Sequence, residues 1–150
     1  MALTAKLQDS KDLLDAQAVG NGIYGLQNMN SEPVEVRGLV AAVAVKVQES
    51  RETIGAQEVG NTLYGMQNMS SEHAEVRALL AALAVKVRLS RETINAQHVG
   101  NALYGMQNMS SDSVEVRAML AALTVKVQDS RDTLKSQEIG NLLYGLQSMR

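Results

Sequence analysis

The hydrophobic and polar positions of this chain repeat along its length with a period of 40 residues. Four copies of one 14-residue segment begin at residues 16, 56, 96 and 136, and seven of the 14 positions are identical in all of them: Gln, Gly, Asn, Tyr, Gly, Gln and Met. A period of this kind is typical of repeat arrays, in which each unit buries its apolar face against its neighbours. Residues 2–10 resemble residues 122–130, so the chain begins within the second half of a repeat.

The 14-residue segment predicts an amphipathic helix from Ala16 to about Asn28, with equivalents in the later copies. Its apolar residues recur at spacings of three and four and fall on one face: Ala16, Val19, Ile23 and Leu26. Gly20 and Gly25 lie inside this predicted helix, where each costs about 1 kcal/mol relative to Ala. Because both glycines recur in all four copies, we expect neighbouring helices to approach one another closely at these points.

A second helix is predicted from the polar break near Ser31 to about Gln48. Ser31, Ser71 and Ser111, each followed by an acidic residue, are the expected N-caps. One face of this helix carries large apolar residues: Val36, Leu39, Val40, Val43 and Val47. A nearly opposite face carries small ones: Gly38, Ala41, Ala42 and Val45. Two apolar faces with polar flanks predict a helix that is covered on both sides within a stack.

The alternation of these two helices predicts an all-α fold, an α-solenoid of stacked antiparallel helix pairs, because short connections make successive helices neighbours. We expect seven main helices, an N-terminal remnant and no strand. The whole chain, residues 1–150, is predicted to be a single repeat domain. Its expected parts are a partial repeat at 1–15, full repeats at 16–55, 56–95 and 96–135, and a half repeat at 136–150.

Composition narrows the classes of function. The chain has no Cys, so a disulfide framework and a thiolate metal site are excluded, and we expect no metal and no cofactor. No secretory segment and no long apolar run is present, so we expect a soluble intracellular chain with no membrane partner. The formal net charge of -2 argues against a strong electrostatic grip on nucleic acid, because phosphate contacts supply most non-specific affinity.

We predict no enzymatic activity. The only two histidines, His73 and His98, lie in different repeats and different predicted helices, and no nucleophile–base motif recurs. The spacing of Gly20 and Gly25 matches part of a phosphate-binding loop, but the Lys and Ser/Thr that must follow are absent and the segment is predicted to be helical.

One stripe of the first helix is nearly invariant and combines amides with a Tyr ring. The stripe carries Gln17, Asn21, Tyr24 and Asn28, then Gln57, Asn61, Tyr64 and Asn68, then Gln97, Asn101, Tyr104 and Asn108, then Gln137, Asn141, Tyr144 and Ser148. Stacked repeats align these residues in rows. The rows are interpreted either as structural amide and ring contacts between repeats or as a ligand surface suited to nucleotide bases.

A second stripe of the first helix, with its N-terminal flank, holds the clearest variation among copies. Its residues are Asp15, Ala18 and Gly22, then Gly55, Glu58 and Thr62, then Asn95, His98 and Ala102, then Lys135, Glu138 and Leu142. Repeats that read one base each vary two or three side chains on a fixed scaffold, and this stripe has that form. Ordinary drift at exposed positions produces the same pattern, so both interpretations stay open.

The segment Ala56 to Met66 resembles the first helix of octotricopeptide repeats. Five residues match that motif directly: Gln57, Glu58, Asn61, Thr62 and Leu63. Tyr64 stands where the family has Trp, and Gly60 and Gly65 stand where it has Ala. The resemblance extends over essentially the whole chain, repeat by repeat, and implies a helical-hairpin solenoid that binds single-stranded RNA in gene expression, often in organelles. The regularity of the copies also fits an excised or engineered repeat fragment.

Two functions are therefore predicted as alternatives. The first is a binding module for single-stranded RNA that uses the variable stripe for selection. Its phosphate contacts would come from one of two cationic rows: Lys46, Lys86 and Lys126, or Arg51, Arg91 and Arg131. The second is a protein-interaction or self-assembling scaffold that binds no nucleic acid.

Self-association is the last expectation. The final helix repeats the interior apolar pattern with Ile139, Leu143 and Leu146, and no polar cap is evident at either end of the array. The segment that begins with Leu3 and Leu7 matches part of a second helix. In the repeat frame residue 1 is equivalent to position 161, so a second copy continuing the array leaves positions 151–160 unfilled. We therefore expect head-to-tail homo-oligomers.

Overall fold

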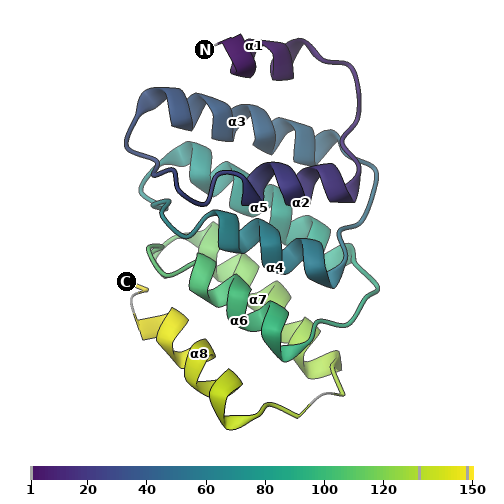
Figure 1. Ribbon diagram of the computed structural model, residues 1–150, viewed down its shortest axis with the longest axis vertical. Helices are drawn as coiled ribbons and strands as arrows, with labels where there is room; N and C mark the ends of the chain where they lie inside the picture. The colour runs from purple at the N-terminus through teal and green to yellow at the C-terminus, as the bar shows by residue number, and fades with distance from the viewer. Residues whose placement is uncertain (1, 132, 148) are drawn as a thin grey trace.

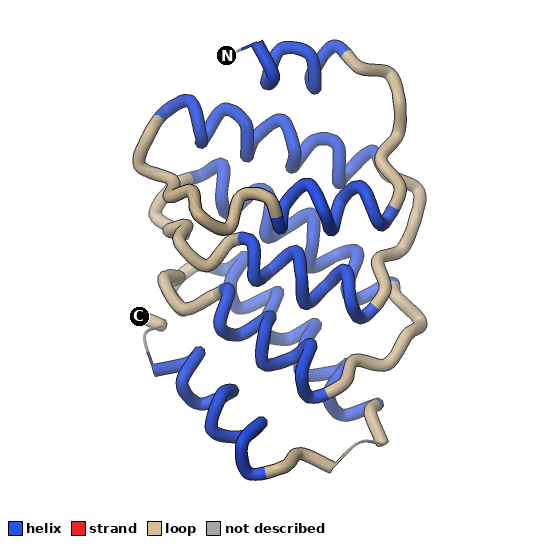
Figure 2. Tube along the Cα trace, viewed as in Figure 1, coloured by secondary structure: helices blue, strands red, loops and turns tan. Residues whose placement is uncertain are grey.

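The computed structural model describes residues 2–131, 133–147 and 149–150, and the side chain of residue 141 lies outside this description. The described residues form eight α-helices and no strand (Figures 1 and 2). The helices are α1 (Ala2–Asp9), α2 (Ala16–Tyr24), α3 (Val34–Glu49), α4 (Ala56–Gly65), α5 (Ala74–Leu89), α6 (Ala96–Gly105), α7 (Val114–Asp129) and α8 (Ser136–Gln147). The predicted all-α fold of seven main helices and an N-terminal remnant is confirmed.

The helices form two layers. In the first layer α2, α4, α6 and α8 pack in order, and in the second layer α1, α3, α5 and α7 do the same. Figure 1 shows the first layer in front of the second, with the N-terminus at the top and α8 at the bottom. Each helix therefore has as its neighbours the equivalent helices of the adjacent repeats, as expected for an α-solenoid.

The hydrophobic core lies between the two layers. The first layer contributes Ile23 and Leu63 and the second contributes Val40 and Leu80, all no more than 1% exposed. Methionine takes the place of aromatic residues here, since Met66, Met69, Met106 and Met109 are fully buried. An unbranched, flexible side chain fits the irregular gaps left where one layer's loops turn into the other.

The glycines of the first layer mark close contact between helices, as predicted. A Cβ atom built on Gly65 falls against the carbonyl group of Ile23, and one built on Gly105 falls against the carbonyl group of Leu63. Both are closer than the 3.0 Å below which real Cβ atoms essentially never lie. From the other side of the same contacts, Gly20 faces Glu58 and Gly60 faces His98, with nearest distances of 3.3 Å.

Three local predictions need correction. The helices α2, α4 and α6 end earlier than Asn28 and its equivalents, at Tyr24, Gly65 and Gly105, whereas α8 continues to Gln147. Ser31, Ser71 and Ser111 are not N-caps; the capping positions are Pro33, His73 and Ser113, and none of these side chains makes a cap hydrogen bond. The small-residue face of the second layer is only partly covered, since Ala42 is 3% exposed but Val45, Val85 and Val125 are 50%, 43% and 52% exposed.

Ser31 and Ser71 instead join neighbouring repeats. The Ser31 hydroxyl accepts a hydrogen bond from the Ser70 N–H at 2.9 Å, and the Ser71 hydroxyl accepts one from the Ser110 N–H at 2.7 Å. Both serines are buried. Each therefore satisfies a backbone donor of the next repeat that water does not reach freely.

Replacing Ser71 by Ala should lower the free energy of unfolding by about 1–3 kcal/mol, because the Ser110 N–H loses its acceptor in a partly buried site. Urea denaturation measures this loss. Ser10 is the control, since its hydroxyl accepts an exposed N–H two residues away. Ser10→Ala should change stability by less than about 0.5 kcal/mol, and equal losses in the two variants would contradict the role given to Ser71.

Candidate functional site

Four tyrosines form a continuous stack along the first layer. Ring centroids of Tyr24 and Tyr64 lie 6.0 Å apart, those of Tyr64 and Tyr104 5.6 Å, and those of Tyr104 and Tyr144 6.4 Å. The rings are tilted by only 14–24° to one another, and the spacing is within the range of favourable aromatic pairs. A glycine follows each Tyr, so the close approach of the helices also brings the rings into contact.

Two rows of amides run beside the Tyr stack. Gln17, Gln57 and Gln97 are exposed, and Asn61 and Asn101 are half-buried. Within the described part of the chain, none of these five side chains makes a hydrogen bond. The fourth row member Gln137 is exposed, while the side chain of Asn141 is outside the described residues. These amides therefore have donors and acceptors available for a ligand.

The remaining row of the predicted stripe is structural. Asn68 Nδ2 donates to the Gln27 carbonyl at 2.8 Å, and Asn108 Nδ2 donates to the Gln67 carbonyl at 2.7 Å. These bonds tie each repeat to the one before it. Asn28 occupies the same position in the first copy and is exposed, and Ser148 lies outside the described residues. The predicted stripe therefore has two parts: the row of Asn68 and Asn108 forms hydrogen bonds between repeats, and the other two amide rows make none within the described part of the chain.

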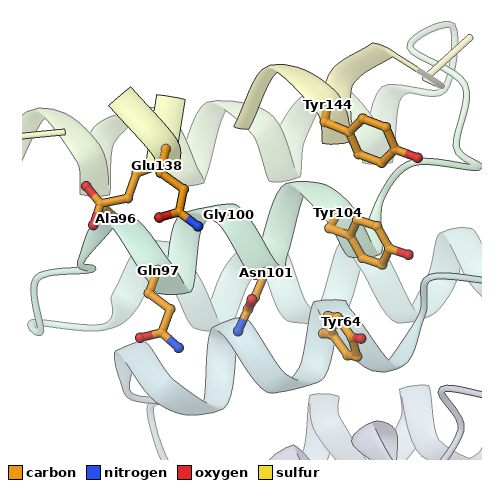
Figure 3. A pocket seen from close by; sticks show the side chains of 9 residues that line it. Tyr64, Ala96, Gln97, Gly100, Asn101, Tyr104, Glu138 and Tyr144 are labelled. Carbon is orange, nitrogen blue, oxygen red and sulfur yellow. The ribbon is translucent and has the colours of Figure 1, made fainter. Parts of the chain in front are cut away.

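Between α6 and α8 the amides and rings line a groove of about 540 Å³. Figure 3 shows Tyr64, Tyr104 and Tyr144 as a column on one side, with Gln97 and Asn101 along α6 and Glu138 reaching down from α8. Among the described residues that line it, the groove holds a carboxylate and no cationic side chain. Its chemistry is therefore neutral to acidic, with paired donors and acceptors beside aromatic surface.

The first position of the variable stripe belongs to helix initiation. Asp15 Oδ1 accepts from the Ala18 N–H at 2.7 Å, and Asn95 Oδ1 accepts from the His98 N–H at 2.9 Å. Gly55 takes the same N-cap position without a side chain. At the fourth copy the Lys135 N–H donates to Glu138 Oε2 at 2.7 Å. Variation at this position therefore changes which group, if any, caps the N-terminus of the first-layer helix.

The other variable positions lie mostly between first-layer helices. Glu58 and His98 cover the glycines of the preceding helix, Ala18 is half-buried in the first copy, and Glu138 borders the groove. Thr62 and Ala102 are 0% exposed, and neither can touch a ligand at the surface. Leu142 packs against the core from α8, and Gly22 is exposed on α2. The structure therefore brings only part of the predicted reading stripe to a surface.

Thr62 has a buried hydroxyl with no hydrogen-bond partner. Replacing it by Val removes this unsatisfied group at nearly constant shape, so Thr62→Val should raise the free energy of unfolding by about 1 kcal/mol. Thermal or urea denaturation tests the sign. Thr124 is the control, because its hydroxyl donates to the Leu120 carbonyl at 2.8 Å on an exposed site. Thr124→Val should not stabilise, and a loss of stability in Thr62→Val would indicate an unseen partner.

The lysines that were predicted to contact phosphates serve the fold. The Nζ atoms of Lys46, Lys86 and Lys126 donate to the backbone carbonyls of Ser10, Ser50 and Ser90 in the preceding loop. Three further cations are engaged in the same way: Arg37, Arg77 and Arg117 donate to loop carbonyls five and six residues before them. The other predicted row, Arg51, Arg91 and Arg131, is exposed in the loops that lead into the first layer.

The two histidines are not brought together. His73 Nε2 lies 3.3 Å from Glu32 Oε1 at the loop before α5, whereas His98 is in the first turn of α6 with a buried Nδ1 that has no partner. No cluster of three or more potential metal ligands is found in the described residues. Hydrogen bonding from the Ser113 hydroxyl lowers the pKa of Glu115, which lies on α7 in the second layer and not in the groove.

None of the described helices combines the length and apolar composition needed to cross a bilayer. Sequence reasoning found the amide rows and the Tyr positions, but it did not distinguish unpaired amides from bonded ones, since all carry the same period. Comparison of the chain with known family models, curated proteins and solved structures finds no match.

Proposed function

We propose that this protein is a helical-repeat module that binds an extended polypeptide across the first layer. One observation supports this most strongly: unpaired Gln and Asn amides recur in register on neighbouring helices beside a continuous Tyr stack. Each amide carries both a donor and an acceptor, as does each peptide group of an extended chain. A row of amides therefore offers matching hydrogen bonds whatever the side chains of the ligand.

The spacing of the repeats suits such a ligand. Packed helices lie about 8–10 Å apart, and an extended chain advances about 3.3 Å per residue. One repeat therefore spans about three residues of peptide. The Tyr rings supply apolar surface for the side chains that turn toward them, with the hydroxyl groups able to remain in water.

Charge favours a polypeptide over RNA. The lysines that were predicted to contact phosphates, Lys46, Lys86 and Lys126, donate to backbone carbonyls. The described lining of the groove contains the carboxylate of Glu138 and no cation. RNA affinity depends on phosphate neutralisation and falls steeply with salt. The resemblance to octotricopeptide repeats implies RNA, and the exposed Arg51, Arg91 and Arg131 agree with it. RNA binding is therefore the competing outcome of the experiment.

The test selects from two pools with the same immobilised protein: random peptides of about 12 residues, enough to cross three repeats, and random single-stranded RNA. We expect enrichment of peptides whose affinity is nearly independent of salt. Enrichment of RNA alone, with an affinity that falls steeply between two salt concentrations, would replace this proposal by RNA binding. Enrichment in neither pool would also contradict it.

Asn61→Ala with Asn101→Ala should weaken binding of a selected peptide by about 10–100-fold, because two or more hydrogen bonds are lost. Stability should stay within about 0.5 kcal/mol, because these amides have no partner in the protein. Asn68→Ala with Asn108→Ala is the matched control. This pair lies outside the groove and ties repeats together, so the control should lose stability and keep peptide affinity.

A further inference from the structure

The outer face of the second layer, turned away from the viewer in Figure 1, is apolar and largely open. Its valines recur at the same positions in successive repeats. Val34 and Val114 are 64% and 63% exposed. Val45, Val85 and Val125 are 50%, 43% and 52% exposed. Scattered apolar residues are ordinary on a protein surface, whereas a contiguous patch over the neighbouring helices α3, α5 and α7 marks an interaction site.

An apolar groove of about 370 Å³ runs between α5 and α7 on this face. Alanines form most of its lining: Ala84 and Ala122 are buried, Ala81 is half-buried, and Ala118 and Ala121 are exposed. Such short side chains let another helix approach closely, because nothing long stands between the two backbones. The groove is therefore suited to packing against a second helical surface.

The two ends of this groove carry opposite charges. Arg88 is exposed at the C-terminal end of α5, where the equivalent residues of α3 and α7 are Gln48 and Gln128. Glu115 is half-buried at the N-terminal end of α7 and accepts the Ser113 hydroxyl at 2.7 Å. Both line the groove, and neither has an ion-pair partner in the described part of the chain. Because α5 and α7 are equivalent helices that run in the same direction, the two charges lie diagonally opposite, about 20 Å apart.

We propose that two copies of this chain pack face to face through the second layer as a two-fold symmetric dimer. A two-fold axis can lie in the plane of the contact, through the centre of the groove and perpendicular to the line from Arg88 to Glu115. This axis exchanges the two ends of the groove, so each Arg88 meets Glu115 of the second copy while the alanines meet at the centre. A surface whose opposite charges are exchanged by such an axis is complementary to itself, which is why we assign it to a second copy.

The size of the patch suits a weak dimer. Residues 34–45 and their equivalents extend about 17 Å along each helix, and three helices packed 8–10 Å apart span about 25 Å. With the charged rim, two copies bury about 1,000 Å² in total, at the lower limit for specific interfaces. This dimer does not depend on the proposed peptide binding, because the amide rows and the Tyr stack lie on the other layer.

Reversing either charge tests the arrangement. Arg88→Glu puts carboxylates at both ends of the groove, and Glu115→Arg puts guanidinium groups at both ends. Sedimentation velocity from about 1 to 500 μM should show a monomer–dimer equilibrium for the unsubstituted chain, as expected for a small interface. Each variant alone should raise the dissociation constant about 10–100-fold, because like-charged pairs replace both ion pairs. Arg51→Glu makes the same charge change in an exposed loop, so this control should dimerise as the unsubstituted chain does.

Mixing the two charge variants gives a sharper result. Each end of the contact then joins a carboxylate to a guanidinium group, so the mixture should form a 1:1 dimer about as readily as the unsubstituted chain. Neither variant should do so alone, and circular dichroism checks that both are folded. Ala121→Glu places a charge at an exposed position within the groove and should abolish the dimer, because that charge would be buried unpaired.

Four outcomes would overturn the proposal. The unsubstituted chain would remain a monomer at about 500 μM, the highest concentration suited to a weak interface. Ala121→Glu would dimerise as strongly as the unsubstituted chain, which places the contact on another face. The mixed charge variants would stay monomeric although both are folded. A monomeric chain would bind neutral phosphatidylcholine vesicles and lose this binding in Ala121→Glu, which assigns the face to a bilayer surface instead.

Discussion

Gly105→Ala is expected to destabilise the protein more than any other single methyl addition considered for the first layer. The new Cβ would fall against the Leu63 carbonyl group and the Tyr64 nitrogen, both of which are backbone atoms. A flexible side chain could move aside, but two packed helices must separate. The gain in helix propensity is only about 1 kcal/mol, whereas the shift of two helix backbones costs about 3 kcal/mol or more. Urea denaturation should show a net loss of at least about 2 kcal/mol.

Gly140→Ala is the matched control, because it adds the same methyl group to a first-layer helix where nothing lies within 4 Å. Here only helix propensity and the entropy of the unfolded chain change, so the variant should gain about 0.5–1 kcal/mol. Opposite signs in the two variants are the diagnostic result. A stabilised Gly105→Ala would show that the helices are further apart than described.

Leu63→Ala and Leu143→Ala should differ greatly although the two leucines hold the same repeat position. Leu63 is 1% exposed and belongs to the core between the layers, whereas Leu143 is 61% exposed. Deleting the buried side chain costs about 2–5 kcal/mol, because transfer free energy is lost and a cavity remains. The exposed one should cost less than about 0.5 kcal/mol.

The comparison should be made at low protein concentration, so that contacts between molecules do not contribute to the measured free energies. Equal losses for the two variants would mean that Leu143 is covered within one chain. Far-UV circular dichroism of both variants checks that the remaining helices are intact before the free energies are compared.

Periodicity predicted the fold well because each repeat has the same neighbours. The 40-residue period, the two helices and the close approach at Gly65 and Gly105 all follow from local pattern. Whether a helix face is buried does not follow from local pattern. The small-residue face of the second layer is apolar in sequence, yet Val45 and Val85 are exposed. Periodicity shows which side chains share a face, but it does not show what packs against that face.

Contacts between repeats account for the other differences. Ser71 followed by an acid has the local form of an N-cap, but its hydroxyl bonds a residue 39 positions later. Lys86 has the form of a solvated cation, but its Nζ bonds a carbonyl 36 positions earlier. In the candidate site, Asn61 and Asn68 are both repeated amides, and only the second finds an inter-repeat carbonyl. Single-residue patterns do not separate such cases, since the deciding partner is a whole repeat away.

The carboxylates of Glu52 and Glu92 have a consequence for how the array comes apart. Glu52 accepts the Ala16 N–H and Glu92 accepts the Ala56 N–H, each at 3.0 Å and each from the loop that leads into the next first-layer helix. The first turns of α2 and α4 are therefore coupled to the folding of the loops before α4 and α6. Because such coupling is reciprocal, these neighbouring segments should open together, as in a linear chain of coupled switches. Amide hydrogen exchange at Ala16 should then report on the opening of the loop that contains Glu52.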